Sequence, residues 1–311
     1  MKNENIFLSN RAVLKISGTN CLTFLNNILT SDITKIKPKE IVPSALLSPQ
    51  GRILFDMLIS LGPIKKINDL GYVLIECEVT QADDLFKKIT IYNLRKEVII
   101  EKTKYKVFVT KNPKDHLHSL IDKRFFETSI GRFYKDIEIE DIDLETNQTS
   151  IKDINWYNLL RYINCIPEGP KEIIPNVSLP LEINLDLLGG ISFEKGCFIG
   201  QEVNARVKWK GLVKKKYVPI IIENEDLSIT HYNIDNENKI FLKDIEIGKI
   251  MSLAYDKIVN KYFGIAIIKL VHLYNFEENS DLECYHEESK IKIRFPQYLL
   301  PLPKKTINFL D

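Results

Sequence analysis

The chain lacks the cysteine patterns by which metal and disulfide sites are usually recognised. Its 311 residues contain five cysteines, which are widely spaced and form no Cys-x-x-Cys pair. This disfavours a zinc ribbon or a self-contained cluster motif. A disulfide framework is equally disfavoured in a large chain without a secretion signal. We therefore expect reduced thiols and no permanently bound metal.

Long apolar runs and an excess of charge are also missing. No run approaches the length of a membrane span, and the N-terminal MKNENIFLSNRAVLKISG enters a strand-like pattern without the apolar core of a signal peptide. We expect a bacterial cytoplasmic location rather than the mitochondrial matrix, because no presequence is visible. The 43 Lys and Arg against 42 Asp and Glu leave a net charge of +1. That balance predicts neither a nucleic-acid partner nor a membrane partner.

Several common catalytic signatures are missing as well. The sequence contains no G-x-G-x-x-G, no Walker loop and no G-x-S-x-G, and its five histidines have no H-E-x-x-H spacing. These absences disfavour nucleotide-dependent chemistry, α/β-hydrolase chemistry and a histidine-ligated metal site.

What is present predicts a mixed fold of more than one unit. RAVLKISG and GYVLIECEV are strand-like, ALLSPQGRILFDMLI is typical of a hairpin, and TNCLTFLNNILTSDI and INWYNLLRYI are helical. In the second of these helices we expect Trp156, Leu159, Leu160 and Ile163 to face inward. Strands and helices mix without regular alternation, which indicates the α+β class. After Gly211 the pattern becomes β-rich and predicts a small C-terminal barrel.

One segment singles out a cysteine. In ISFEKGCFIGQEVNAR, Cys197 follows Lys195 and Gly196 and precedes Phe198, Gly200 and Gln201. QEVNARVKW has helical character, in which Glu202 can pair with Arg206. A helix start and a nearby lysine both stabilise a thiolate, which can act as nucleophile, redox centre or transient ligand of a soft metal. The alternative is a buried small residue in a tight turn, the commoner fate of a cysteine.

Arg161 is a second candidate, because a cation on an otherwise apolar helix often has a specific anionic partner. A surface salt bridge is the commoner outcome for such a residue.

The segment Lys195-Gly196-Cys197-Phe198-Ile199-Gly200-Gln201-Glu202 resembles the K-G-C-[FY]-x-G-Q-E signature of the YgfZ/Iba-type family. The proteins of this family are relatives of the glycine-cleavage T-protein (GcvT), bind folate and support iron–sulfur protein maturation. RAVLKISGTNCLTFLNNILTSDI, ALLSPQGRILFDMLI, LPLEINLDLLGGISF and IGKIMS with YFGIAIIKL resemble further segments of the family.

The resemblance implies a fold of three units around a central cavity. These are a split α+β domain, an inserted ferredoxin-like domain and a C-terminal β-barrel. We expect residues 1–210 to form the GcvT-like folate-binding region, with the inserted subdomain at roughly 45–110, and residues 211–311 to form the barrel. By the same resemblance, Arg161 and Glu182 are candidate contacts for tetrahydrofolate or a derivative, and Cys197 with Lys195 is the candidate catalytic pair.

The resemblance leaves three functions open. The first is a folate-binding accessory factor that matures or maintains iron–sulfur proteins, notably those with [4Fe–4S] clusters, and so indirectly supports tRNA modification. The second is a folate-dependent one-carbon transferase; GcvT uses an aspartate where VIIEKTKYKVFV offers none. The third is a non-catalytic scaffold. Expected partners are folate and iron–sulfur client or assembly proteins, bound by a monomer without direct contact to nucleic acid.

Overall fold

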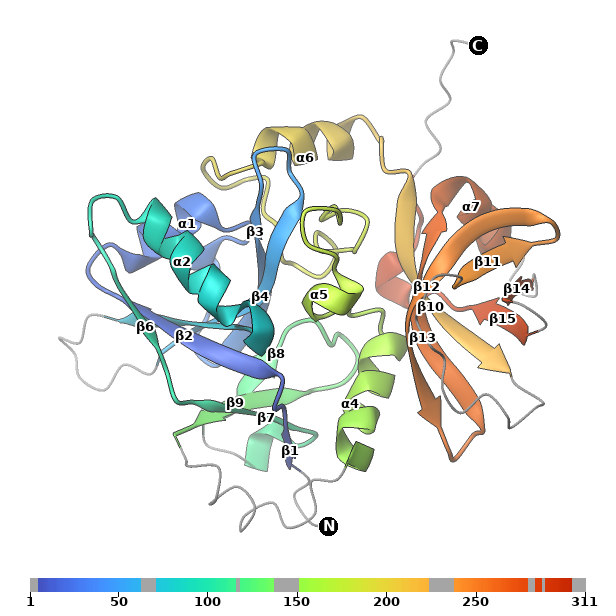
Figure 1. Ribbon diagram of the computed structural model, residues 1–311, viewed down its shortest axis with the longest axis horizontal. Coiled ribbons are helices and arrows are strands. Elements are labelled where there is room, and N and C mark those ends of the chain that lie inside the picture. Colours follow the sequence, from blue (N-terminus) through green and yellow to red (C-terminus); the bar gives the residue numbers. More distant parts are fainter. Residues whose placement is uncertain are drawn as a thin grey trace. The chain divides into compact units, whose positions relative to one another are not determined.

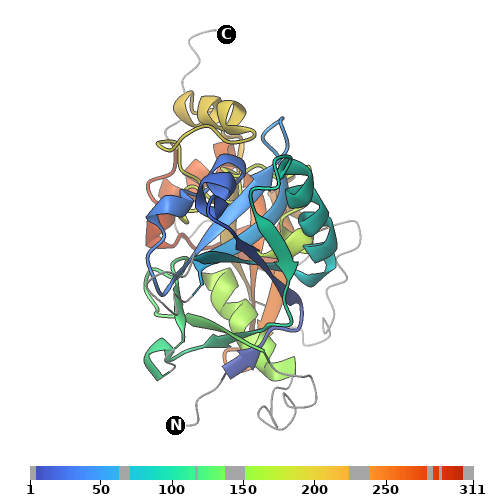
Figure 2. The same ribbon diagram turned by 90° about the vertical axis from the view of Figure 1, so that its left-hand side faces the viewer.

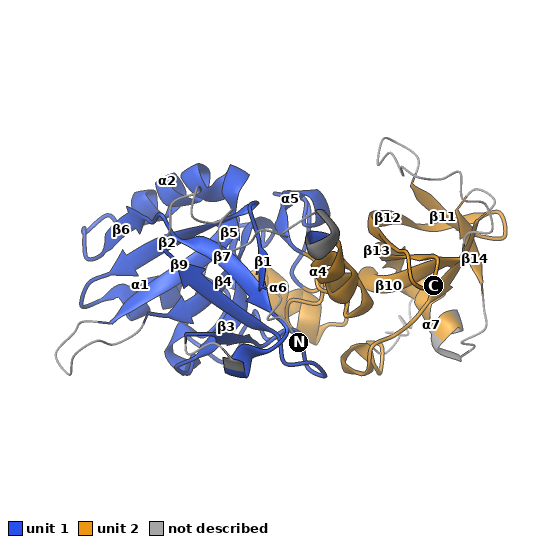
Figure 3. Cartoon of the chain, turned by 90° about the horizontal axis from the view of Figure 1, so that it is seen from below, with its two compact units in different colours: residues 1–154, 168–180, 188–201 blue, residues 155–167, 181–187, 202–311 orange. Residues whose placement is uncertain are grey.

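The structure is a computed structural model that describes residues 5–62, 71–115, 118–136, 151–223, 238–278, 283–286 and 289–303. It divides into two compact units, which Figure 3 colours separately. Unit 1 comprises residues 1–154, 168–180 and 188–201, and unit 2 comprises residues 155–167, 181–187 and 202–311. The predicted boundary after residue 210 and the predicted inserted subdomain stay predictions.

Unit 1 is built on a nine-stranded sheet with the order β1-β7-β9-β8-β3-β4-β5-β2-β6. Its strands are β1 (Asn5–Phe7), β2 (Arg11–Ser17), β3 (Glu40–Leu47), β4 (Ile53–Leu61), β5 (Tyr72–Glu78), β6 (Ile99–Lys102), β7 (Lys106–Thr110), β8 (Leu120–Asp122) and β9 (Gly131–Lys135). The predicted hairpin is confirmed, because β3 and β4 pair antiparallel around the turn at residues 48–52. β3 and β8 pair parallel, and the remaining described pairs of this sheet are antiparallel.

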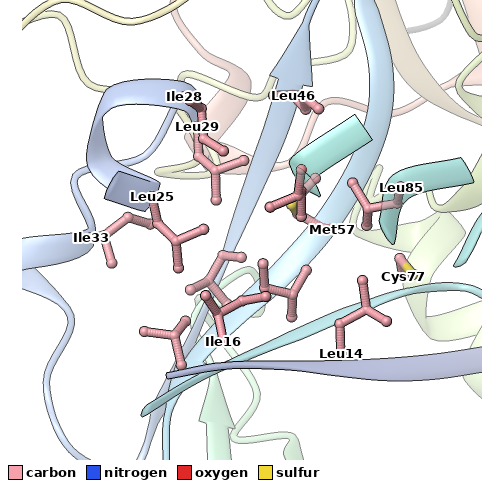
Figure 4. Close-up of a cluster of buried hydrophobic side chains, with 14 of the residues drawn as sticks. Leu14, Ile16, Leu25, Ile28, Leu29, Ile33, Leu46, Met57, Cys77 and Leu85 are labelled. Carbon is pink, nitrogen blue, oxygen red and sulfur yellow. The ribbon is translucent and has the colours of Figure 1, made fainter. Parts of the chain in front are cut away.

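Two helices cover one face of this sheet, as Figures 1 and 2 show. They are α1 (Cys21–Ile28) and α2 (Ala82–Tyr92). Leu25 of α1 and Leu85 of α2 point toward Leu14 of β2 and Met57 of β4 in Figure 4, and all four side chains are buried. Side chains alternate between the faces of a strand. The apolar residues of one parity therefore form the core beneath the helices.

The other parity carries polar and charged residues to the opposite face. Arg132 on β9 contacts Glu76 on β5, although three strands separate β9 from β5 in the sheet. Neighbouring strands lie about 4.8 Å apart, so a flat sheet would place these two strands roughly 19 Å from each other. An arginine side chain does not span that gap. The sheet of unit 1 therefore curls, and it encloses these charged residues.

Unit 2 contains a closed six-stranded barrel, which confirms the predicted C-terminal β unit (Figure 1). The strand order is β10-β13-β12-β11-β14-β15. The strands are β10 (Lys215–Glu223), β11 (Lys239–Leu242), β12 (Ile245–Asp256), β13 (Lys261–Lys269), β14 (Cys284–His286) and β15 (Ser289–Ile293), and α7 (Leu270–Glu278) follows β13. Alternating residues such as Val218, Ile220 and Ile222 fill the barrel interior.

Helix α4 (Ile151–Ile163) buries a different face from the one predicted. Of residues 154–163, Tyr157, Arg161 and Tyr162 are buried, Trp156, Leu159 and Leu160 are half-buried, and Ile163 is 47% exposed. The prediction placed apolar residues inward by type. The helix instead buries two tyrosines and an arginine, and the Arg161 guanidinium lies 5.5 Å from the ring centre of Tyr157 and 5.0 Å from that of Tyr162.

The remaining helical elements are short. They are α5 (Gly169–Glu172), α6 (Gln201–Trp209) and the 3₁₀ turns η1 (Ile33–Lys35), η2 (Val79–Gln81), η3 (Pro113–Asp115) and η4 (Gln297–Leu299). Within the described part of the chain, no helix has both the length and the apolar character needed to cross a membrane.

Candidate functional site

The loop that carries Cys197 spans residues 191–200, and we call it the cysteine loop. Its first end is fixed to the sheet through Thr30, whose side chain is fully buried. The Thr30 hydroxyl donates to the carbonyl of Gly190 at 2.6 Å and accepts from the amide of Ala45 at 2.8 Å. The amide of Ser192 donates to the Thr30 carbonyl at 2.9 Å. One buried hydroxyl thus joins the start of the cysteine loop to β3.

The second end of the cysteine loop rests against the turn between β3 and β4. Gly200 has φ +78°, and a Cβ added there would lie 2.6 Å from the Ser48 carbonyl oxygen and 2.9 Å from Gly51 Cα. Only glycine accommodates both the left-handed backbone and this close approach. Gly196, by contrast, faces open space without a left-handed φ. Of these two glycines, Gly200 is the structural requirement.

The middle of the cysteine loop presents its thiol to solvent. Phe198 is buried, and Ile199 packs against the core cluster of unit 1. Cys197, which directly precedes these two residues, is exposed, whereas the other four cysteines are buried: Cys21, Cys77, Cys165 and Cys284. The predicted alternative, a buried small residue in a turn, therefore does not describe Cys197. An exposed thiol on an anchored loop is accessible to a partner or a metal.

Lys195 does not serve the thiol in the way the sequence predicted. Its ammonium donates to the carbonyls of Asn26 at 2.6 Å and Ser31 at 2.9 Å, and to the carbonyl of Leu29. It also lies 4.8 Å from the centre of the Phe198 ring. Burial lowers the pKa of Lys195 to about 8, and the nearby Asp32 carboxylate partly opposes this decrease. The side chain is committed to the end of α1.

The signature residues after Gly200 lie on α6, as predicted. The helix begins too far along the chain for its N-terminus to stabilise the Cys197 thiolate as predicted. Its first residue is Gln201, four residues beyond Cys197, and the Gln201 amide donates to the Phe198 carbonyl at 3.2 Å. Glu202 and Arg206 are both exposed. Their predicted ion pair is not found among the described residues. Gln201, Glu202 and Arg206 therefore keep a site role only as a prediction.

Arg161 and Glu182, the predicted folate contacts, lie in unit 2. The Arg161 guanidinium is buried, donates to the Ile166 carbonyl at 2.9 Å and to Asn158 Oδ1 at 3.0 Å, and lies 5.5 Å from the centre of the Tyr157 ring. Glu182 is half-buried, and its carbonyl accepts from the Tyr217 amide at 2.8 Å. In this arrangement Arg161 closes the end of α4 and does not present an exposed partner for a carboxylate tail. The folate role of both residues stays a prediction.

Sequence reasoning missed a buried ionic network in unit 1. Arg132, with no exposed surface, contacts Glu76, Asp122 at 3.1 Å and Glu168 at 2.8 Å. Arg124 joins Asp122 and Glu168, each at 2.6 Å. Arg11 donates to Glu76 at 2.8 Å. The available signal was a charge inside an apolar strand, as in VLIEC, because such a charge is buried only with a partner.

The network sets the ionisation of two aspartates in opposite directions. Burial opposes ionisation of Asp122, but Arg124 and Arg132 outweigh it and hold the pKa of that carboxyl below its ordinary value. Burial raises the pKa of Asp56, and Arg11 and the Gly169 amide only partly offset this effect. The Gly169 amide donates to Asp56 Oδ2 at 3.1 Å. Asp122 is thus held as a carboxylate, while Asp56 resists losing its proton.

Unit 2 also buries a lysine whose partners are polar. Lys216 donates to Asn184 Oδ1 at 2.9 Å, and Asn184 donates to the Tyr217 carbonyl at 3.0 Å. Burial lowers the pKa of Lys216. Among the described residues, no group of three or more His, Cys, Asp and Glu is placed to hold a metal ion.

Several known proteins to which the chain is similar carry the same name, that of an iron–sulfur cluster assembly factor. The chain is 31% identical over 228 residues to the mitochondrial iron–sulfur cluster assembly factor IBA57 homologue of Phaeosphaeria nodorum, a match that covers 68% of the chain and 54% of that protein. It is 30% identical over 238 residues to the Neurospora crassa homologue, covering 70% and 53%. The human mitochondrial IBA57 is 26% identical over 232 residues, covering 68% and 65%. The chain therefore spans about half to two thirds of the length of these relatives.

A solved structure supports the fold. The glycine cleavage system aminomethyltransferase T of Bartonella henselae superposes with a TM-score of 0.70 at 11% sequence identity, covering 94% of this chain and 85% of that one. No family model matches the chain. The α+β class and the GcvT-like fold are confirmed, and so is the resemblance to the YgfZ/Iba-type family.

The predicted bacterial cytoplasmic location is wrong. The relatives are named as mitochondrial proteins, which points to mitochondria instead. The prediction rested on an N-terminal segment in which no presequence was visible. Such a segment does not report where the folded protein works.

Proposed function

Because the homologues of the chain are IBA57-type iron–sulfur cluster assembly factors and its fold is that of GcvT, we propose that it assembles iron–sulfur clusters through Cys197. The relatives support the process, and the cysteine loop supports the residue. The chain spans only part of the length of these relatives, and we propose that this part retains their activity.

The observation that carries this proposal is the contrast between Cys197 and the other four cysteines. Cys197 alone is exposed, on a loop anchored at Thr30 and Gly200. A thiolate is a preferred ligand for the iron of a cluster. On binding, the thiol gives its proton to solvent and its sulfur donates an electron pair to iron. No electron is transferred.

One thiol does not hold a cluster by itself. Clusters are commonly ligated by four cysteines, and the four other cysteines of this chain are buried. The remaining ligands would come from the protein that delivers or receives the cluster. We therefore propose that the chain acts as a monomer with iron–sulfur donor or client proteins, with the cluster as cargo.

Complementation tests this role directly. In cells that lack the endogenous relative, we expect the wild-type chain to restore the activity of a [4Fe–4S] enzyme and Cys197→Ser to restore little of it, with a loss of tenfold or more. The same extracts are assayed for a [2Fe–2S] enzyme as a comparison. We propose that the chain serves chiefly [4Fe–4S] proteins and, through them, supports tRNA modification.

Cys21→Ala is the matched control, because it removes a buried thiol from the same unit. We expect it to complement wherever it accumulates to the wild-type level. Full activity with Cys197→Ser at equal protein level would disprove a role of the exposed thiol.

Folate binding is the finer part of the proposal and is supported by the sequence resemblance alone. Calorimetric titration with tetrahydrofolate tests it, and Arg161→Lys is expected to weaken any binding at least tenfold if Arg161 contacts the ligand. If Arg161→Lys binds as tightly as wild type, Arg161 serves only the end of α4. Turnover of a methyl or aminomethyl donor by Cys197→Ser would instead favour the one-carbon transferase.

A further inference from the structure

The cysteine loop is fastened in its middle as well as at its ends. Glu194, Gly196 and Cys197 are exposed, whereas Lys195 between them turns inward. Of residues 194–197, Lys195 is the one for which the described structure records side-chain hydrogen bonds to another segment. The acceptors lie at residues 26–31, more than 160 positions earlier in the chain.

One of these acceptors is a group that a helix end leaves without a donor, and the other two follow directly after the helix. The carbonyl of Asn26 is among the last four of α1, which have no intrahelical N–H partner. No basic residue occurs in the last turn of α1. A cation at a helix C-terminus is favourable, because the backbone dipoles concentrate partial negative charge there. The ammonium from the cysteine loop supplies this cation.

The aromatic neighbour completes the arrangement. Phe198 is buried directly after Cys197, and the Lys195 ammonium lies 4.8 Å from the centre of its ring. A cation within about 6 Å of an aromatic centroid is attracted by the ring. Lys195 therefore bridges the two sides of Cys197: it belongs to the loop before the thiol, contacts the ring after it and bonds to the end of α1.

We propose that Lys195 is a positioning residue that latches the cysteine loop to the end of α1 and so holds the Cys197 thiol facing solvent. The proposal rests on the proposed function only in taking Cys197 as the working thiol. It assigns Lys195 no contact with iron or cluster. The three carbonyl acceptors, rather than the sulfur, are the partners of the ammonium.

A spin label on Cys197 tests the latch without assaying cluster assembly. Because the other cysteines are buried, a maleimide nitroxide is expected to label native wild-type protein at Cys197. Lys195→Met keeps the apolar length of the side chain but removes its hydrogen-bond donors. In this variant we expect the mobile component of the electron paramagnetic resonance spectrum to increase at least several-fold over wild type. Backbone amides of residues 191–200 should exchange hydrogen at least tenfold faster. Lys195→Arg, which retains a cation and donors, is expected to restore most of the immobile spectrum.

Lys210→Met is the matched control, because Lys210 is exposed and lies outside the cysteine loop. It should leave both measurements unchanged. Should Lys195→Met fail to fold, acylation of native wild type decides: a latched Lys195 reacts with an acetylating ester at least tenfold more slowly than Lys210. An unchanged spectrum and unchanged exchange in a folded Lys195→Met, or equal acylation of the two lysines, would overturn the latch. If the cysteine loop becomes mobile in Lys195→Met but this variant still complements fully, the latch exists but is not needed for function.

Discussion

At the scale of single residues, the site depends on which polar groups face solvent and which are hydrogen-bonded within the protein. The sequence placed Lys195 two residues before Cys197, and that proximity suggested a lysine that stabilises the thiolate. In the structure the ammonium bonds to the carbonyls of Asn26 and Ser31. Two neighbours in sequence thus divide the work: Cys197 faces outward, and Lys195 faces the protein.

The pKa of Lys195 predicts how the cysteine loop responds to pH. Burial, partly opposed by Asp32, lowers this pKa to about 8, whereas a solvent-exposed lysine has a pKa of about 10.4. Between these values the open loop binds more protons than the latched loop. Rising pH therefore favours the latched state, and the advantage is lost as pH falls through about 8. The neutral amine has two N–H donors for the three carbonyls and loses the attraction to the Phe198 ring and the helix end, but it no longer carries the cost of burying a charge; the lowered pKa means that this cost outweighs the losses.

The nitroxide spectrum of labelled wild-type protein checks this sign. Its mobile component is expected to shrink as the pH rises from about 7.5 to 9.5. Lys195→Met should show no such trend, because it has no amine to titrate. A mobile component that grows with pH in wild type would contradict the prediction.

At the scale of elements, the periodic segments were predictable and the faces of their helices were not. The hairpin around Ser48 and Gly51 and the barrel after Gly211 followed from alternation and turn residues, which act locally. The buried side of α4 differs from the predicted one, because Tyr157 and Arg161 are buried there and Arg161 bonds to Asn158 and to the Ile166 carbonyl. These contacts involve polar and aromatic groups, which a pattern of apolar residues does not report.

The cysteine loop shows the same division. The helix that follows it, α6, was predictable from a short segment, whereas the sequence left open whether Cys197 is exposed or buried. Its attachment to Thr30 and to the β3–β4 turn joins residues about 150 positions apart. No periodicity reports a contact of that range, and residue type alone does not distinguish the constrained Gly200 from the unconstrained Gly196.

Those two glycines provide the prediction at this scale. Gly200→Ala would put a Cβ 2.6 Å from the Ser48 carbonyl oxygen on a left-handed backbone, so the loop end or the turn must shift. We expect a loss of about 2 kcal/mol or more in the free energy of unfolding. Gly196→Ala adds its Cβ to open space and is expected to change stability by less than about 0.5 kcal/mol. Urea denaturation of both variants measures the difference, and equal losses would show that the contact with the turn is unimportant.

At the scale of the whole molecule, the charge that the sequence reports as balanced is unevenly distributed. Unit 1 buries three arginines, Arg11, Arg124 and Arg132, together with the carboxylates of Glu76, Asp122 and Glu168. These charges compensate one another inside the curled sheet. Asp56 on β4 adds a fourth carboxylate to the same face. The net charge of +1 gave no indication of this internal arrangement.

The two aspartates should therefore affect stability with opposite signs. Asp122, whose pKa the arginines lower against the effect of burial, stabilises the fold as a carboxylate; this contribution is present above about pH 4 and is lost as pH falls through its folded pKa. Asp56, whose pKa burial raises, contributes fully below about pH 4, and that contribution is lost as pH rises through its folded pKa. At neutral pH the first carboxylate supports the fold, and the second works against it.

Asparagine substitutions separate these contributions. At pH 7, Asp122→Asn is expected to cost about 3–5 kcal/mol, because it leaves buried guanidinium groups without their anion. Asp56→Asn is expected to stabilise the protein at pH 7, since the amide oxygen still accepts from Gly169 without a buried charge. Both differences from wild type should shrink as pH falls toward 3, where the carboxyls are protonated in the unfolded chain. Urea denaturation at pH 7, 5 and 3 tests both signs, and an Asp56→Asn variant less stable than wild type at pH 7 would show that Arg11 needs Asp56 as an anion.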